Sequence, residues 1–153
     1  MKNRYKAGFF GLCVLLSFTA NSQETIPVKQ HIPDKPFIFS QLPQRSDCIT
    51  NELFALFKSV APSKISLTLP GGRKLNGTIS EKVLRNPAVT SINIRLDEYP
   101  GALFSLSLIE EPGRPQKLVG RIIHPQSGDL LELVQENQSF YFEKKIQKYF
   151  MTE

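Results

Sequence analysis

The chain has 153 residues and a formal net charge of +5, from 19 Lys and Arg against 14 Asp and Glu. Three of the basic residues and none of the acidic ones lie in residues 1–22, so the remainder carries 16 against 14, a net charge of +2. A nucleic-acid-binding surface needs a basic face with many phosphate contacts. The densest remaining cluster, Lys144, Lys145 and Lys148, is typical of a solvated sheet edge. We therefore expect no nucleic-acid partner.

Residues 1–22 have the pattern of a secretory signal peptide. Basic residues precede an apolar run over residues 7–18, and the small residues Ala20 and Ser22 stand three and one positions before a cleavage site after residue 22. The apolar run is too short for a permanent transmembrane helix, although an uncleaved anchor is the alternative. We therefore predict a periplasmic or extracellular protein with no stable membrane span after cleavage.

Cys48 is the one cysteine left once the predicted leader, which holds Cys13, is removed. No intramolecular disulfide can then form. A lone thiol in an exported chain is either buried and inert or available for an intermolecular bridge. We expect burial, because free cysteine is among the most buried residue types.

Residues 23–46 form a proline-rich arm or linker, since four prolines favour extended or irregular backbone. The first part, up to about Lys35, is expected to be poorly ordered. The apolar cluster Phe37-Ile38-Phe39 can attach the arm to the domain.

An amphipathic helix is predicted next. Asp47 or Thr50 can cap its start, and Pro62 ends it. Its apolar face repeats at the helical period and comprises Ile49, Leu53, Leu56, Phe57 and Val60. Three turns are not stable alone, so this face must pack on a sheet.

From Ile65 to Phe142, apolar residues alternate with polar ones in short runs separated by turns, which is the pattern of half-buried antiparallel strands. Residues 81–89, with Asn86-Pro87, are predicted as a loop. The expected fold is mainly β (α+β): a curved antiparallel meander of about seven strands with one N-terminal helix packed on it, in a single domain over residues 47–150. Matching the apolar faces predicts five hairpins, which pair Leu69 with Leu75, Leu96 with Phe104, Leu108 with Leu118, Ile122 with Leu131, and Leu133 with Phe140.

Two glycines lie on the inward face of this predicted sheet. Gly77 is placed opposite Leu67, and Gly120 between Leu106 and Leu133. A glycine inside a strand usually marks a bend or a close backbone approach, and we prefer this interpretation to a ligand contact.

One predicted hairpin is apolar on both faces. Its outer face holds Val119, Ile123, Leu130 and Val134, although the outer face of a half-solvated sheet should be polar. Either another segment covers this face, or it is an exposed patch for a partner. We treat the four residues as a candidate partner-binding surface, with a free sheet edge as the other candidate.

No catalytic or metal-binding pattern is visible. His31 and His124 each have one nearby acidic residue, Asp34 and Asp129, whereas metal sites need several ligands at close spacing. Cys48 with His124 is the one conceivable nucleophile–base pair, and nothing in the sequence places them together. We predict no catalytic residue, no metal and no cofactor.

Three segments within residues 92–143 give the order strand, glycine-containing strand, turn and strand: Ser105-Leu106-Ser107-Leu108, Gly120-Arg121-Ile122-Ile123-His124-Pro125 and Gly128-Asp129-Leu130-Leu131-Glu132-Leu133. This order resembles the β-rich accessory or pro-segment regions that precede some secreted metallopeptidases. No catalytic domain or zinc-binding helix follows in this sequence. The resemblance therefore implies a binding or folding-assistant domain, and no functional residue carries over.

The predicted function is that of a secreted or periplasmic, non-catalytic domain that binds another exported macromolecule through an apolar sheet face or edge. The alternative is a half-barrel carrier of a lipid or other apolar ligand, with Phe104, Phe140 and Phe142 lining its cavity. A solid core favours the first function, and a cavity under the helix favours the second.

Overall fold

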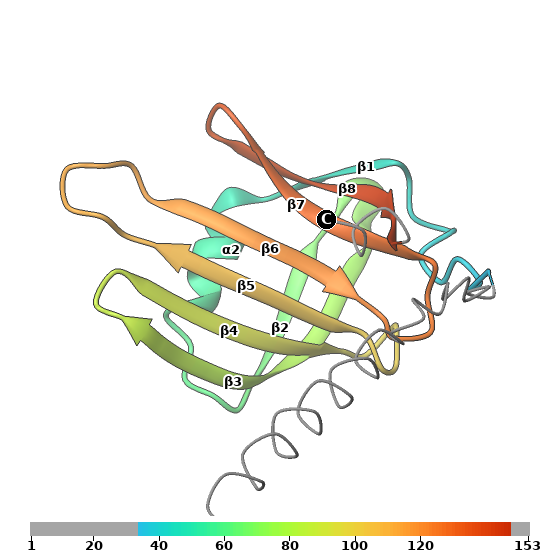
Figure 1. The fold of residues 1–153 in the computed structure, drawn as a ribbon, viewed down its shortest axis with the longest axis horizontal. Coiled ribbons are helices and arrows are strands. Elements are labelled where there is room, and N and C mark those ends of the chain that lie inside the picture. The colour runs from blue at the N-terminus through green and yellow to red at the C-terminus, as the bar shows by residue number, and fades with distance from the viewer. Residues whose placement is uncertain (1–33, 148–153) are drawn as a thin grey trace, which may run out of the picture. The chain divides into compact units, whose positions relative to one another are not determined.

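The computed structural model describes residues 34–147, which form one antiparallel sheet of eight strands and one α-helix, α2 (Thr50–Leu56) (Figure 1). From β2 to β8 each strand pairs with the next along the chain, and β1 then pairs with β8. The predicted antiparallel meander is confirmed, with eight strands in place of about seven. The strands are β1 (Arg45–Cys48), β2 (Ser63–Thr68), β3 (Lys74–Asn86), β4 (Val89–Leu96), β5 (Leu103–Ile109), β6 (Lys117–Ile123), β7 (Asp129–Glu136) and β8 (Ser139–Ile146).

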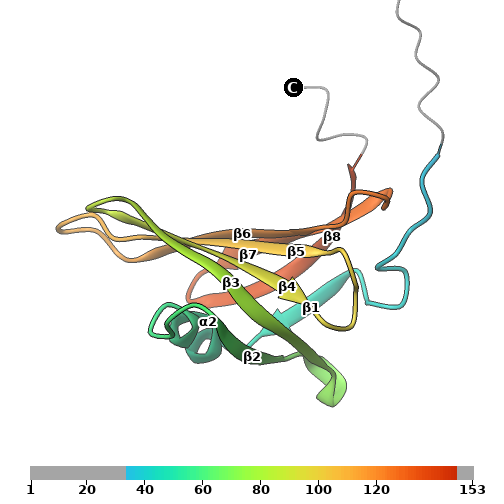
Figure 2. The ribbon, with the colours of Figure 1, turned by 90° about the horizontal axis from the view of Figure 1, so that it is seen from below.

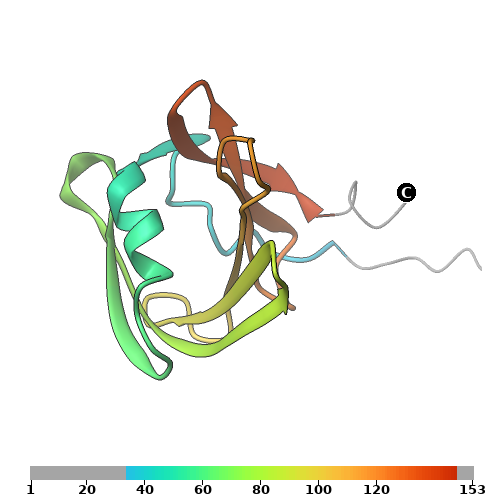
Figure 3. The same ribbon diagram turned by 90° about the vertical axis from the view of Figure 1, so that its left-hand side faces the viewer.

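The sheet curls into a half-barrel, and α2 lies on its concave side (Figures 2 and 3). Side chains alternate between the two faces of each strand, and in β5 and β6 every second residue is buried. The helix connects the two edge strands, β1 and β2, which do not pair with each other. The predicted packing of a helix on a curved sheet is therefore confirmed.

One hydrophobic core fills the inside of the curl. It takes residues from the segment before β1, from α2 and from the strands, and Phe39, Leu53, Phe104 and Phe142 are its largest fully buried members. The rings of Phe104 and Phe142 meet edge to face, with centroids 5.4 Å apart. These rings belong to β5 and β8, which are not neighbours in the sheet, so the contact crosses the interior.

The predicted hairpin registers are correct for two hairpins and wrong for three. Leu108 pairs with Leu118, and Ile122 with Leu131, as expected. The other three hairpins are shifted by two residues. Such a shift keeps the same side chains on the core face, so matching apolar faces cannot detect it. The observed pairs are Leu67 with Leu75, Ile94 with Phe104, and Leu133 with Phe142.

Residues 81–86, predicted as a loop, continue strand β3 to Asn86. Register shifts between Ile79 and Glu81 and between Leu84 and Asn86 break the alternation there, because each bulge adds an unpaired residue to the strand. Most side chains in this part of β3 are exposed, so an apolar pattern is also lacking. Because pairing with β2 ends at Ile79, β3 and its partner β4 extend past β2.

The helix is shorter than predicted. It ends at Leu56, and the next amides bond three residues back, Lys58 N–H to the carbonyl of Ala55 at 3.0 Å. Val60 therefore lies outside the helix. Neither Asp47 nor Thr50 caps the helix, because Ile49 holds the capping position without a side-chain bond.

The predicted signal peptide (residues 1–22), residues 23–33 of the predicted arm and His31 lie outside the described residues. The described part of the arm packs on the domain, since Phe39 is fully buried and its backbone N–H donates to Asp129 Oδ1 at 3.3 Å. Phe37, predicted to help attach the arm, is 54% exposed.

Candidate functional site

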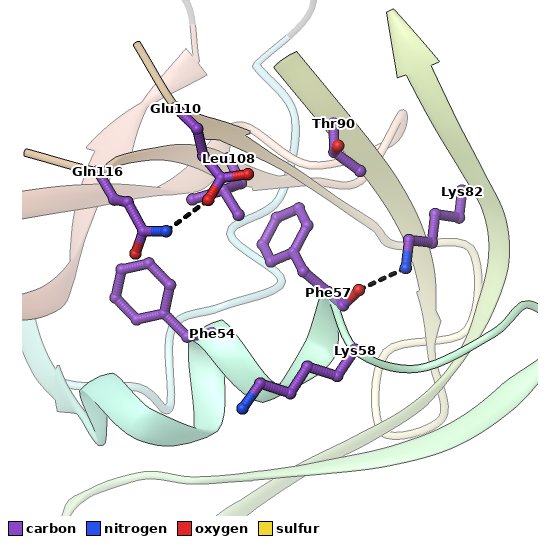
Figure 4. A pocket seen from close by; sticks show the side chains of 8 residues that line it. All are labelled: Phe54, Phe57, Lys58, Lys82, Thr90, Leu108, Glu110 and Gln116. Atoms are coloured by element: carbon purple, nitrogen blue, oxygen red, sulfur yellow. Dashed lines mark hydrogen bonds between the residues drawn. The ribbon is translucent and has the colours of Figure 1, made fainter. Parts of the chain in front are cut away.

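A cleft of about 400 Å³ opens between α2 and strands β3–β5, at the end of the sheet where β3 and β4 outrun β2 (Figure 4). A second cavity of about 510 Å³ adjoins it, and the two share Lys82 and Thr90. The cleft is lined by Phe54, Phe57, Lys58, Lys82, Thr90, Leu108, Glu110 and Gln116, and the second cavity also by Val60, Ala61 and Leu84.

The cleft exists because β2 covers only the first half of β3. Pairing between these strands ends at Ser63 and Ile79, so no strand of residues 34–147 lies beside the remainder of β3 on that side. α2 and its C-cap residue precede β2 in the chain, and they direct Phe54 and Phe57 toward the sheet (Figure 4). Phe54 also packs edge to face on Phe140, with centroids 6.1 Å apart, so the base of the cleft continues into the core.

Lys82 bridges the two sides of the cleft. Its ammonium group donates to the carbonyl oxygen of Phe57 (Figure 4). It also donates to the carbonyl oxygen of Ser59 at 3.1 Å. These carbonyls follow the last turn of α2, where peptide oxygens lack helical partners and a cation is favourable. Lys82 therefore fixes the distance between β3 and the end of α2.

Glu110 contributes negative charge on the opposite side of the cleft. It follows β5, its backbone N–H donates to the carbonyl of Ala88 at 2.8 Å, and its carboxylate accepts a hydrogen bond from the amide of Gln116. Lys58 is exposed nearby on the helix side. The cleft thus combines an apolar base with a rim that carries both signs of charge, an arrangement suited to binding.

The four residues predicted as a partner-binding surface do not form one continuous patch. Val119 is 46% exposed, Leu130 is 3% exposed, and Ile123 and Val134 are half-buried. A band of charged residues crosses the outer face between Val119/Val134 and Ile123/Leu130. It contains the cross-strand pair Arg121 and Glu132 and the ion pairs of Lys145 with Glu132 and Glu143, at 2.5 Å and 3.3 Å.

Phe104, Phe140 and Phe142, predicted to line a ligand cavity in the alternative function, are all buried in the core. Phe104 and Phe142 pack against each other. None of the three lines the cleft or its adjoining cavity. The aromatic side chains at the base of the cleft are Phe54 and Phe57 instead. Phe57 belongs to the apolar helix face predicted from the sequence, and Phe54 does not.

Cys48 is half-buried on β1, and burial raises the pKa of its thiol to about 12. His124 is engaged elsewhere. Its Nδ1 accepts the backbone N–H of Gln126 at 3.1 Å, so its Nε2 carries the proton and donates to the carbonyl of Pro100 at 3.0 Å. These bonds occupy both ring nitrogens, and no contact between His124 and Cys48 supports the one conceivable dyad.

Asp129 is the buried carboxylate of the opposite end of the sheet. Its Oδ1 accepts from Ser127 Oγ and from the backbone of Phe39, and its Oδ2 has no hydrogen-bond partner. Within residues 34–147, no three His, Cys, Asp or Glu side chains gather closely enough to hold a metal ion. The hydrogen bonds of Asp129 with Ser127 and with the backbone of Phe39 anchor the arm to the β6–β7 turn.

Several residues of the cleft and its adjoining cavity were not predicted as site residues. Lys82 and Leu84 lie in the predicted loop, and Val60 lies on the predicted helix face. Thr90, Glu110 and Gln116 flank turns and carry no motif. The one available signal was the alternation of Lys82 and Leu84 with Glu81 and Val83, which a bulge on each side makes too short to recognise.

Comparison with known protein families, curated proteins and solved structures finds no match to this chain. The resemblance to regions preceding secreted metallopeptidases therefore stays a prediction. In the part of the chain that the structure describes, no helix has the length and apolar character needed to cross a membrane.

Proposed function

We propose that this chain is an exported, non-catalytic binding module that receives a segment of another exported macromolecule in the cleft between α2 and strands β3–β5. The observation that supports this proposal most directly is the composition of the cleft. Phe54, Phe57 and Leu108 offer an apolar base, and Lys58 and Glu110 place opposite charges around it.

A protein segment suits this composition better than a lipid does. Protein interfaces typically combine an apolar centre, rich in aromatic residues, with a polar rim. The volume of about 400 Å³ holds a few side chains. A lipid tail needs a longer, wholly apolar cavity, and the interior of the half-barrel is filled by Phe104 and Phe142.

The outer face is a weaker candidate for this role. Its charged band separates the exposed Val119 from the buried Leu130. An interface centre buries apolar side chains that are accessible in the free protein, and only Val119 of the predicted four is well exposed.

A small apolar ligand is the second candidate function. The cleft has a size within the range of about 300–1,000 Å³ that is typical of small-molecule sites. Native mass spectrometry of freshly purified protein tests it. A co-purified mass that Thr90→Arg removes would favour the carrier function, and a spectrum of the empty chain would favour the binding module.

The binding proposal is tested by cross-linking the full-length chain in the cells that make it, with mass spectrometry of the exported fraction. Thr90→Arg places a long side chain in the cleft. The matched control is Thr78→Arg, another half-buried strand threonine, which lies on β3 between β2 and β4 and lines neither cavity. Val119→Asp tests the outer face.

We expect a cross-linked partner that Thr90→Arg removes and that both Thr78→Arg and Val119→Asp retain. Loss with Val119→Asp alone would transfer the site to the outer face. A partner that survives all three substitutions would contradict both surfaces. Export itself rests on the pattern of residues 1–22, and intact mass of the secreted protein should show a chain that begins at Gln23.

A further inference from the structure

We propose that a second copy of this chain pairs with the uncovered part of β3, residues 81–85, as an antiparallel strand related by a two-fold axis at Val83. This proposal does not depend on the function of the cleft. It rests on an unpaired strand edge, on two exposed apolar side chains beside it, and on the charge sequence along it.

The edge of β3 is open beyond the end of β2. α2 covers the edge of β2, where the carboxylate of Glu52 accepts the backbone N–H of Thr68 at 2.6 Å. Beyond Ile79, β2 no longer accompanies β3, and no strand of residues 34–147 pairs with Glu81–Asn86 on the side away from β4. Unpaired backbone groups of this kind accept a further strand.

The two most exposed large hydrophobic side chains in residues 34–147 lie beside this edge. Val60 is 79% exposed and Leu84 is 68% exposed, and both line the cavity next to the cleft. Neighbouring apolar side chains that are exposed to water often mark an interaction surface. A strand added at this edge would cover Leu84.

The side chains of this segment alternate between the two faces of the sheet. Lys82 and Leu84 stand opposite Ile92 and Thr90 on the concave face, and Glu81 and Val83 stand opposite Asn93 and Ser91 on the other face. A two-fold axis perpendicular to a sheet keeps each face on its own side. Because residues directly opposite each other lie on the same face, the axis must pass between the two copies of one residue. The candidates for this residue are Lys82, Val83 and Leu84.

An axis at Val83 is the one that matches the charges. It places Glu81 opposite Arg85 of the second copy, twice by symmetry, and Lys82 opposite Leu84, whose side chain the lysine stem can cover. An axis at Lys82 would bring two lysines together. An axis at Leu84 would leave Glu81 without a partner strand. The segment paired in this way stops one residue before β3 ends at Asn86, and Pro87 begins the β3–β4 turn.

The charges also explain why this edge would select its own kind. Charged residues on an edge strand normally prevent pairing with other strands. Here Glu81 and Arg85, four residues apart, carry opposite charges that complement the same sequence read in the antiparallel direction. An in-register parallel pair would place Glu81 opposite Glu81 and Arg85 opposite Arg85, and like charges directly opposite each other are destabilising.

The test is a charge-exchange series on the full-length chain, with the dimer dissociation constant measured by analytical ultracentrifugation. Glu81→Arg and Arg85→Glu should each weaken the dimer by about tenfold or more, since each substitution alters two symmetry-related pairs. The double variant Glu81→Arg/Arg85→Glu should restore it. Lys74→Glu is the control, because it is an exposed charge change on the part of β3 that β2 covers.

Restoration in the double variant supports the proposal, since Glu81 and Arg85 are too far apart on one extended strand to pair within a copy. A chain that stays monomeric up to its solubility limit would overturn it. A dimer that the single substitutions leave intact, or that the double variant fails to restore, would overturn it as well. Circular dichroism of each variant separates a lost dimer from a lost fold.

Discussion

The carboxylate of Glu52 in α2 accepts two hydrogen bonds from Thr68 in β2, one from the backbone N–H at 2.6 Å and one from the hydroxyl at 3.0 Å. This contact joins the helix to the edge strand of the sheet. It occupies a backbone donor of β2 that no strand of residues 34–147 uses. The helix therefore both covers the core and is tied to one edge strand, and the open stretch of β3 begins beyond Ile79, where β2 no longer accompanies it.

Replacing Glu52 should loosen this connection. Glu52→Ala removes a charge-assisted acceptor from two half-buried donors, and we expect a loss of about 1–3 kcal/mol in the free energy of unfolding. Urea denaturation measures it. The control, Glu111→Ala, breaks the exposed ion pair with Arg114, so its effect should stay below about 0.5 kcal/mol. Equal effects of the two substitutions would contradict the role assigned to Glu52.

Phe104 should be sensitive to truncation because its ring lies in the core. Phe104→Ala removes a fully buried ring that contacts Phe142, and we expect destabilisation by about 3–5 kcal/mol. Phe37→Ala, at a 54% exposed position, should change stability by about 1 kcal/mol or less. A tolerated Phe104→Ala would contradict the close packing of the core around this ring.

The glycines of the inward face should resist substitution. A Cβ on Gly77 would lie 2.5 Å from the carbonyl oxygen of Arg95, and one on Gly120 would lie 2.7 Å from a side-chain methyl of Leu106. Backbone yields less readily than a methyl group, so we expect Gly77→Ala to cost more than Gly120→Ala, for which about 1–3 kcal/mol is typical. Thermal denaturation of both variants measures the order. The reverse order would mean that the strands approach differently.

Cys48 should be unreactive in the folded protein. Burial raises the pKa of its thiol from the ordinary 9.0 to about 12, so at pH 8 the folded chain holds about a thousandfold less thiolate than the unfolded chain. Alkylation by iodoacetamide, compared with and without denaturant, should show a difference of this order. Since unfolding lets the thiol ionise, stability should also fall as the pH rises from 9 to 12, and Cys48→Ser should lack this contribution. Equal alkylation rates would contradict the burial of the thiol.

The fold class was accessible from the sequence because alternation of apolar residues is a local signal. The face of each strand follows from it, and Phe104, Ile122 and Leu131 all enter the one core. Register was accessible only where the turn fixed it. Leu67, not Leu69, pairs with Leu75, since either choice buries the same face and the conformation of the Pro70–Gly72 turn decides.

The cleft was less accessible for a physical reason. The cleft and its adjoining cavity arise where regular patterns end: Lys82 and Leu84 lie between two bulges, and Val60 lies after the helix has ended. β1 was missed because a four-residue strand with the sequence Arg-Ser-Asp-Cys has no apolar alternation, and its place is set by pairing with β8. Such features depend on contacts between segments distant in sequence.

The central claim is that the meander curls far enough to bring β5 and β8 together across one interior, with the cleft between α2 and strands β3–β5. In a flat sheet, strands three positions apart are separated by about 14 Å, whereas the rings of Phe104 and Phe142 lie 5.4 Å apart between centroids. Nuclear Overhauser effects between these two rings, measured on selectively labelled phenylalanine, test the claim most directly. The curled sheet predicts strong ring-to-ring signals, and their absence in a folded sample that shows the β5–β6 and β7–β8 backbone contacts would contradict it.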